Sequence, residues 1–165
     1  MFKSKDLYMK NIYDLNGKKV GTSKEILIDF YTGRVLGLEI NTFGFKNDYV
    51  DIKDIIQIDE EILIKKVSEI KGIRFSDIRD MEVIDRLGNS KGVVEDLLIE
   101  EESYDIKGII LNSGIIDTLL KGKEVILINN SVLGEEYILY LGQPNIVFKN
   151  IPHEINRNEN VKKAY

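Results

Sequence analysis

The sequence contains no cysteine, no tryptophan and a single histidine. Without cysteine the chain can form no disulfide, no thiolate metal site and no cysteine nucleophile, which fits a reducing compartment. The lone histidine, His153, follows Pro152 near the chain end, where we expect a structural or neutral role. No serine occupies the strand-turn-helix elbow of a Ser-His-Asp hydrolase. We therefore predict that the protein is not an enzyme and has no catalytic residue, cofactor or metal.

Long uncharged apolar stretches are also missing. The first residues, MFKSKDLYMKN, lack the apolar core of a signal peptide. No stretch approaches the roughly 18 uncharged apolar residues that a membrane helix needs. We predict a cytoplasmic protein without membrane insertion.

Acidic residues are unevenly distributed along the chain, whose net charge is -5. Lys and Arg against Asp and Glu number 12 and 12 in residues 1–71, but 7 and 14 in residues 72–145. An acidic surface repels phosphate backbones, so nucleic-acid binding by the second half is not expected. The same argument leaves the neutral first half open.

The chain contains an internal repeat. A shift of 71 residues aligns residues 2–42 without a gap, and beyond them the shift becomes 76, which places five extra residues of the second copy within SGIIDTLLKGKE. The repeat predicts two domains, residues 1–71 and 72–145, and a C-terminal arm, residues 146–165. The identical pairs are Asp6 with Asp77, Asp14 with Asp85, Gly17 with Gly88, Gly21 with Gly92, Leu27 with Leu98, Ile28 with Ile99, Gly37 with Gly108, and Asn41 with Asn112.

Each copy has the pattern of a β-meander rich in Ile, Leu and Val. Asn16 and Gly17 predict a tight hairpin turn between strands at residues 11–15 and 18–30. Gly21 predicts a bulge or bend that curls the sheet. We therefore predict an all-β fold of two consecutive small β-barrels, with five to six strands each. The arm is apolar at residues 146–148, enough to pack on a barrel as a strand, and polar and partly flexible at its end.

Two groups of residues are candidate binding sites. Carboxylates gather in the second copy but lack the spacing and central glycine of a calcium loop, which favours a solvated edge over a metal site. Apolar residues occupy equivalent loops of the two copies, and there they either plug or seal the barrels or form a docking surface for a protein. The carboxylates are Glu95, Asp96, Glu100, Glu101, Glu102 and Asp105, and the apolar loop residues are Phe43, Phe45, Ile115, Ile116, Leu119 and Leu120.

The hairpin D-x-x-G-x-x-x-G, followed by EILID and TGRVLGLEI, resembles the PRC-barrel family, named after the photosynthetic reaction centre H subunit. TFGF and IIQIDEEILI are similar to small sporulation-associated members of spore-forming bacteria. The second copy keeps the glycines but has Ser103 and Tyr104 at the T-G turn. The resemblance implies six-stranded barrels, no common catalytic residues and a role in protein contacts or assembly. The first copy matches at Asp14, Gly17, Gly21, Ile26, Ile28, Asp29, Thr32, Gly33, Val35, Gly37 and Leu38.

These observations favour a non-enzymatic protein-interaction or assembly module, whose partner the sequence does not identify and which could form a homodimer through barrel edges or loop faces. Two other hypotheses remain open. One is an RNA-processing or ribosome-assembly accessory factor that uses the neutral first barrel, since a ribosome maturation factor contains the same domain. The other is a ligand or metal sensor that uses the acidic second barrel.

The loop hypothesis predicts that Phe43→Asp combined with Leu119→Asp removes partners captured from native lysate, because carboxylates replace apolar contacts on both loops. Affinity capture with wild-type and variant protein measures this. Unchanged partners on a variant that still folds would contradict the assignment.

Overall fold

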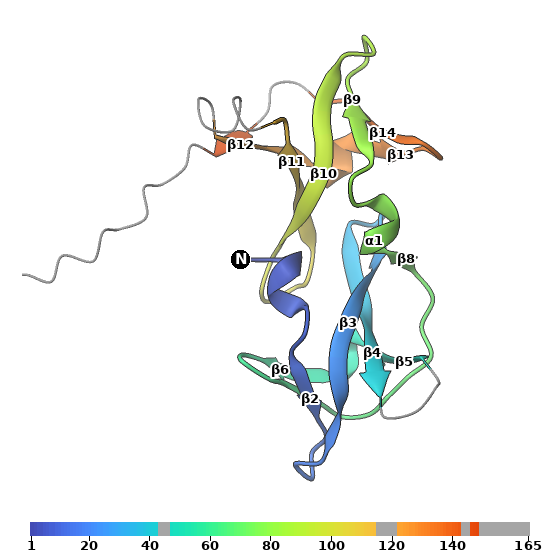
Figure 1. The fold of residues 1–165 in the computed structure, drawn as a ribbon, viewed down its shortest axis with the longest axis vertical. Coiled ribbons are helices and arrows are strands. Elements are labelled where there is room, and N and C mark those ends of the chain that lie inside the picture. Colours follow the sequence, from blue (N-terminus) through green and yellow to red (C-terminus); the bar gives the residue numbers. More distant parts are fainter. Residues whose placement is uncertain (43–46, 115–121, 143–145, 149–165) are drawn as a thin grey trace, which may run out of the picture.

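The computed structural model describes residues 1–42, 47–114, 122–142 and 146–148, and they form an almost entirely β structure (Figure 1). Elements of the first repeat are β1 (Phe2–Lys3), η1 (Ser4–Leu7), β2 (Asn11–Tyr13), β3 (Lys19–Asp29), β4 (Arg34–Thr42), β5 (Asn47–Asp51), η2 (Ile52–Asp54), β6 (Ile55–Ile58) and β7 (Ile62–Ile64). Elements of the second are β8 (Ile73–Arg74), α1 (Phe75–Ile78), β9 (Glu82–Ile84), β10 (Ser90–Ile99), β11 (Ile106–Asn112), β12 (Lys123–Leu127), η3 (Ile128–Asn130), β13 (Ser131–Leu133) and β14 (Tyr137–Tyr140). The C-terminal arm contributes β15 (Ile146–Phe148).

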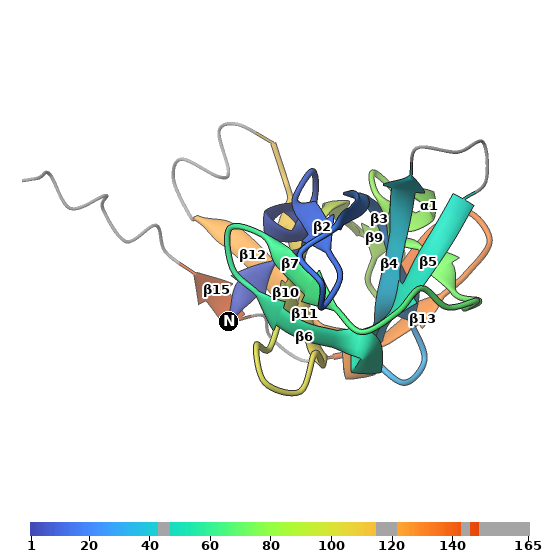
Figure 2. The same ribbon diagram turned by 90° about the horizontal axis from the view of Figure 1, so that it is seen from below.

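The strands form two sheets, one for each repeat. The first has the order β5-β4-β3-β2-β7-β6, and the second has the order β13-β14-β9-β10-β11-β12-β15. In both sheets the first hairpin strand lies parallel to the last strand of the meander, β2 beside β7 and β9 beside β14. Figure 2, seen from below, shows the strands of the first repeat curling around a common interior. The prediction of an all-β fold with two small barrels is confirmed.

Local turn chemistry follows the predicted pattern. Gly17 and Gly88 have φ angles of 75° and 82°, as the hairpin turns require. The turn after β3 also needs a residue with positive φ, and Gly33 provides it. In the equivalent turn of the second repeat, after β10, the residue is Tyr104, with φ of 57°. A tyrosine in this region carries a backbone strain of about 1 kcal/mol. The second repeat therefore keeps the turn geometry although it has lost the glycine.

Gly21 has the role that the sequence indicates, and a further one. A register shift lies opposite it, between Ile12 and Tyr13 in the β2–β3 ladder, so the predicted bulge is confirmed. A Cβ atom at Gly21 would collide with the carbonyl oxygen of Asn41, and one at Gly92 would collide with that of Asn112. Glycine is thus needed at this bend because neighbouring backbones approach closely.

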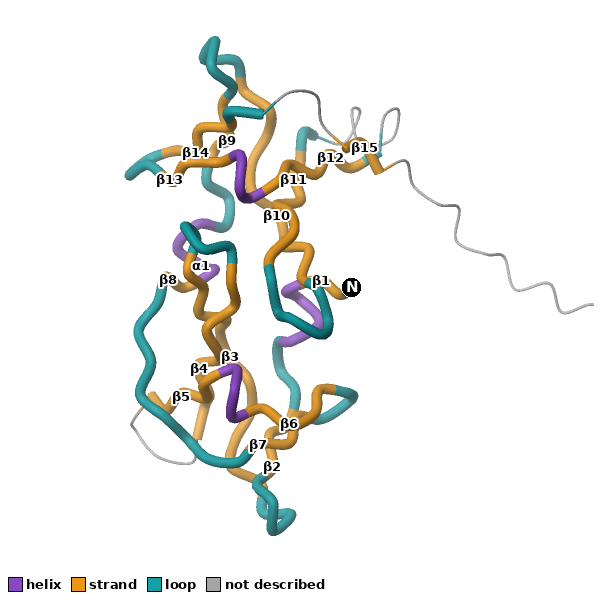
Figure 3. Tube along the Cα trace, turned by 180° about the vertical axis from the view of Figure 1, so that it is seen from behind, coloured by secondary structure: helices purple, strands orange, loops and turns teal. Residues whose placement is uncertain are grey.

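The two long strands need partners beyond their own repeat. β3 has 11 residues and β10 has 10, whereas their hairpin partners β2 and β9 have three each. β8 of the second repeat pairs with the far half of β3, at Leu27 and Ile28. β1 of the first repeat pairs with the far half of β10, at Leu98 and Ile99. The repeats therefore exchange their first segments, and Figure 3 shows β1 beside β10 and β8 beside β3.

One hydrophobic core extends through both repeats. The exchanged segments bury Leu7 at 1% exposure, Phe75 at 0% and Ile78 at 1%. These side chains belong to the same cluster as Ile28 of β3 and Ile99 of β10. The predicted bounds of 1–71 and 72–145 stay a prediction, and the strand pairing adds that residues 2–7 and 73–78 each pack on the opposite repeat.

The C-terminal arm begins as predicted, with a strand. β15 pairs with β12 through Phe148, Val147 and Ile146. The rest of the arm, which includes His153, lies outside the described residues. No helix within the described ranges is long and apolar enough to cross a membrane.

Gly37 gives a test of the close packing. Its Cβ would collide with the carbonyl oxygen of Val50 and lie 2.6 Å from Ile70 Cδ1. We expect Gly37→Ala to lower the free energy of unfolding by about 3 kcal/mol. Gly17→Ala is the control, because nothing lies within 4 Å of its Cβ and only its positive φ costs about 1 kcal/mol. Urea unfolding measures both, and equal losses would contradict the packing argument.

Candidate functional site

The predicted docking residues lie in loops outside the described part of the chain. Phe43 and Phe45 belong to residues 43–46, and the other four belong to residues 115–121. Their role in docking therefore stays a prediction. Among the described residues, contacts between equivalent positions of the two repeats lie at the junction between them.

The carboxylates of the second repeat have protein partners. Glu95 pairs with Lys123, and Glu100 lies 2.6 Å from the Lys107 ammonium. Glu101 lies 3.8 Å from the terminal amine of Met1. Within the described ranges no group of three or more acidic or histidine side chains could hold a metal ion. Most of the predicted acidic cluster is thus engaged in contacts that hold the fold together.

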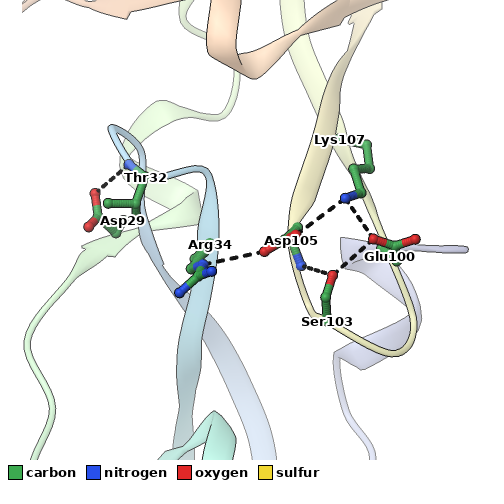
Figure 4. Close-up of polar contacts among 7 residues, drawn as sticks. All are labelled: Asp29, Thr32, Arg34, Glu100, Ser103, Asp105 and Lys107. Atoms are coloured by element: carbon green, nitrogen blue, oxygen red, sulfur yellow. Dashed lines mark hydrogen bonds and ion pairs between the residues drawn. The ribbon is translucent and has the colours of Figure 1, made fainter.

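At the junction, the β3–β4 and β10–β11 hairpins lie side by side (Figure 4). Arg34 and Asp105 form an isolated antiparallel bridge, and Arg34 Nε lies 3.3 Å from Asp105 Oδ1. The two residues occupy equivalent positions, 71 apart, so a pseudo-two-fold axis passes between them. Reciprocal backbone hydrogen bonds flank the bridge: Val35 N donates to Tyr104 O at 3.1 Å, and Ile106 N donates to Gly33 O at 2.7 Å.

The charges around this bridge form a small network. The Ser103 hydroxyl, the Lys107 ammonium and the charge of Arg34 hold the pKa of the Asp105 carboxyl below its usual range. Lys107 and Ser103 likewise lower the pKa of Glu100. Both carboxylates raise the pKa of Lys107. The groups are therefore all ionised at neutral pH, and Asp105 faces Arg34 as an anion.

A second contact joins equivalent positions across the axis. The Arg79 guanidinium lies over the ring of Tyr8, 5.5 Å from its centroid, and also over the ring of Phe75, at 5.0 Å. Tyr8 donates a 2.6 Å hydrogen bond to Glu25 Oε1. Burial and this bond raise the pKa of the Tyr8 phenol well above its usual value, so it stays neutral. The contact is a cation–π interaction at a partly buried site.

Each exchanged segment is also fixed by a buried carboxylate of the other repeat. In the second repeat, Asp96 is 5% exposed and accepts hydrogen bonds from the hydroxyl of Ser4, the backbone of Lys5 at 3.3 Å and the backbone of Leu97 at 2.8 Å. The buried acceptor therefore holds the N-terminal segment in place because an unsatisfied carboxylate would be costly.

In the first repeat the carboxylate that holds the exchanged segment is Glu39, which is fully buried. Arg74 of β8 donates to it through Nε at 2.9 Å, and Lys24 donates at 2.6 Å. The position equivalent to Glu39 is Ile110, and the position equivalent to Arg74 is Lys3. This ion triad is thus unique to one of the two exchange sites.

The hollows of the surface show no paired nucleophile and base among the described residues. One hollow of about 410 Å³ lies where the β6–β7 hairpin adjoins β2. It contains carboxylates and Tyr13. Burial and the neighbouring Glu61 raise the pKa of the Tyr13 phenol. Its lining residues are Tyr13, Gln57, Asp59, Glu60, Glu61, Ile62 and Leu63.

Sequence reasoning named Asp105 only as a member of an acidic cluster, and it missed Arg34, Tyr8 and Arg79. The signal was present, because the aligned positions 34 and 105 carry opposite charges, and positions 8 and 79 carry a ring and a cation. These pairs can be recognised as contacts only when equivalent positions of the two repeats are known to meet. That knowledge requires the three-dimensional structure.

Removal of one member of the triad tests its contribution. Arg74→Ala leaves buried Glu39 with Lys24 alone, so we expect a loss of about 2 kcal/mol in unfolding free energy. The matched control is Lys3→Ala at the equivalent position of β1, for which we expect less than about 0.5 kcal/mol. Chemical denaturation compares the two variants. If Lys3→Ala cost as much as Arg74→Ala, the triad would not be the anchor of β8.

Comparison with known proteins places this architecture in a family. The PRC-barrel domain matches the chain twice, at residues 1–71 and 70–127. No curated protein matched the chain. The two domain matches follow the internal repeat and together span most of the sequence, and the chain belongs to the PRC-barrel family.

Proposed function

We propose that the protein is a non-enzymatic protein-interaction or assembly module of the cytoplasm, and that its outer strands β6 and β13 receive extended segments of a partner protein. The observation that carries the proposal is that these strands end their sheets at equivalent places and expose equivalent apolar side chains. Ile56 in β6 and Val132 in β13 are each 44% exposed. They align under the shift of 76 residues.

The fold itself uses strand addition for recognition. β1 and β8 are two-residue strands that pair with a long strand of the opposite repeat. An outer strand offers unpaired backbone groups to any extended segment, while its side chains add selectivity. Partner segments that add to β6 or β13 would use the chemistry already present at the junction.

The edges favour a partner with alternating apolar residues. Ile56 lies between two half-buried isoleucines, Ile55 and Ile58, with Gln57 beside it. An added strand would place one apolar side chain over Ile56 and a polar one beyond it. The two edges align in sequence, so one protein molecule could bind two such segments. They differ in that the β6–β7 ladder has a register shift between Ile55 and Gln57, while the β13–β14 ladder has none.

The second-barrel sensor receives less support from the geometry. The carboxylates that would bind a cation contact Lys123, Lys107 and Arg34 or accept hydrogen bonds from Ser4. A cation would have to displace these partners. An interaction surface requires no such displacement.

Charges on the outer strands test the proposal. Ile56→Lys combined with Val132→Lys should reduce retained partners at least tenfold in affinity capture, because lysine disfavours strand addition at an edge. Leu87→Lys is the matched control, since Leu87 is 86% exposed at a hairpin turn and belongs to neither edge. Thermal unfolding verifies that each variant is folded. Retention of every partner by the folded double variant would refute the edge assignment.

A further inference from the structure

We infer that the junction surface of each repeat selects the unlike repeat and rejects a like one, and that Arg34, Asp105, Tyr8 and Arg79 determine this selection. The inference is independent of the proposed function, since it concerns how the two barrels recognise each other. It begins from the symmetry of the junction.

The junction has the geometry of a two-fold dimer interface within one chain. The pairing of Phe2 with Ile99 repeats as that of Ile73 with Ile28. These strand pairings each occur twice, once in each direction across the junction, as in an isologous interface. In a true dimer of identical barrels, residues on the axis would meet their own copies. Here the axis residues meet a different amino acid.

The axis pairs are complementary only in the unlike arrangement. Arg34 faces Asp105, and Tyr8 lies under Arg79. A pair of first repeats would place Arg34 against Arg34, and a pair of second repeats would place Asp105 against Asp105 and Arg79 against Arg79. Like charges that face each other oppose association. A pair of identical repeats would therefore have repulsion at these positions, where the pair of different repeats has attraction.

The exchanged segments add to the same selection. In a pair of second repeats, Arg74 would meet Ile110 in place of Glu39, and it would lose its carboxylate partner. Duplicated barrels that share a fold also share strand-pairing chemistry, because backbone hydrogen bonds do not depend on side chains. The preference for the unlike repeat must therefore come from side chains, namely those at the axis and Glu39.

A cleavable full-length chain tests the inference. A protease site inserted between Lys66 and Val67, where Val67 is 46% exposed, is cut after folding. The two fragments are then unfolded together, refolded by dilution and weighed by native mass spectrometry. We expect pairs of one first and one second repeat only. Like pairs at the statistical share of about half would overturn the inference.

A second experiment tests the residues at the pseudo-two-fold axis by giving both repeats the same amino acids there. Asp105→Arg with Arg79→Tyr gives the second repeat the axis residues of the first, and we expect like pairs to appear. The share of unlike pairs should fall toward about half but stay above it, because the contact between Arg74 and Glu39 still favours unlike pairs. Glu102→Arg is the control, because it makes the same charge change at an exposed position three residues from Asp105, and it should keep exclusive unlike pairing. Exclusive unlike pairing in the double variant would also overturn the inference.

The uncut chain gives a second measurement if the fragments do not refold. Arg34→Asp and Asp105→Arg should each lower the melting temperature by about 2 °C, and the two together should lower it by less than the sum. Additive effects would show that the two positions do not recognise each other, against the inference. The non-additivity should weaken in high salt, as expected for a partly exposed pair.

Discussion

The whole structure depends on the pairing of two strands that are longer than their hairpins. The three-residue β2 and β9 cover only the near halves of β3 and β10. The far halves must find backbone partners, because unpaired buried N–H and C=O groups are costly. The exchanged β1 and β8 supply them. Each barrel is thus completed by a segment that is encoded in the other repeat.

This constraint joins the two barrels into one folding unit. Leu7, Phe75 and Ile78 are buried, and the segments that hold them contact the opposite repeat. Burial of each such side chain contributes about 2 kcal/mol. Loss of the exchange would expose these side chains, and it would also leave the far halves of β3 and β10 without backbone partners on that side. The sequence divides the chain into two repeats, but the folded repeats share one hydrophobic core. We therefore expect them to unfold together.

Much of the fold could be predicted from the sequence because its determinants are local. The turn at Gly17 and the bulge at Gly21 each follow from residues that lie close together in the chain. The exchange could not be predicted, because β1 and β8 are two-residue strands whose partners are chosen by tertiary packing. Alignment of the repeats shows that Lys3 and Arg74 are equivalent, but it does not show which long strand each approaches. For the candidate site, the apolar docking residues named from the sequence lie in loops outside the described ranges. The carboxylates named from the sequence are described, but their partners in the other repeat follow only from the tertiary pairing.

The divergence of the two copies gains a physical meaning from the junction. The excess of acidic residues in the second repeat suggested a separate binding function when the sequence alone was considered. In the folded chain, Asp105 faces Arg34, and Glu101 lies near the terminal amine. Each of these contacts joins an acid of the second repeat to a donor of the first. Part of the charge difference between the copies is therefore complementarity between them, which a duplicated barrel needs in order to pair with its unlike neighbour.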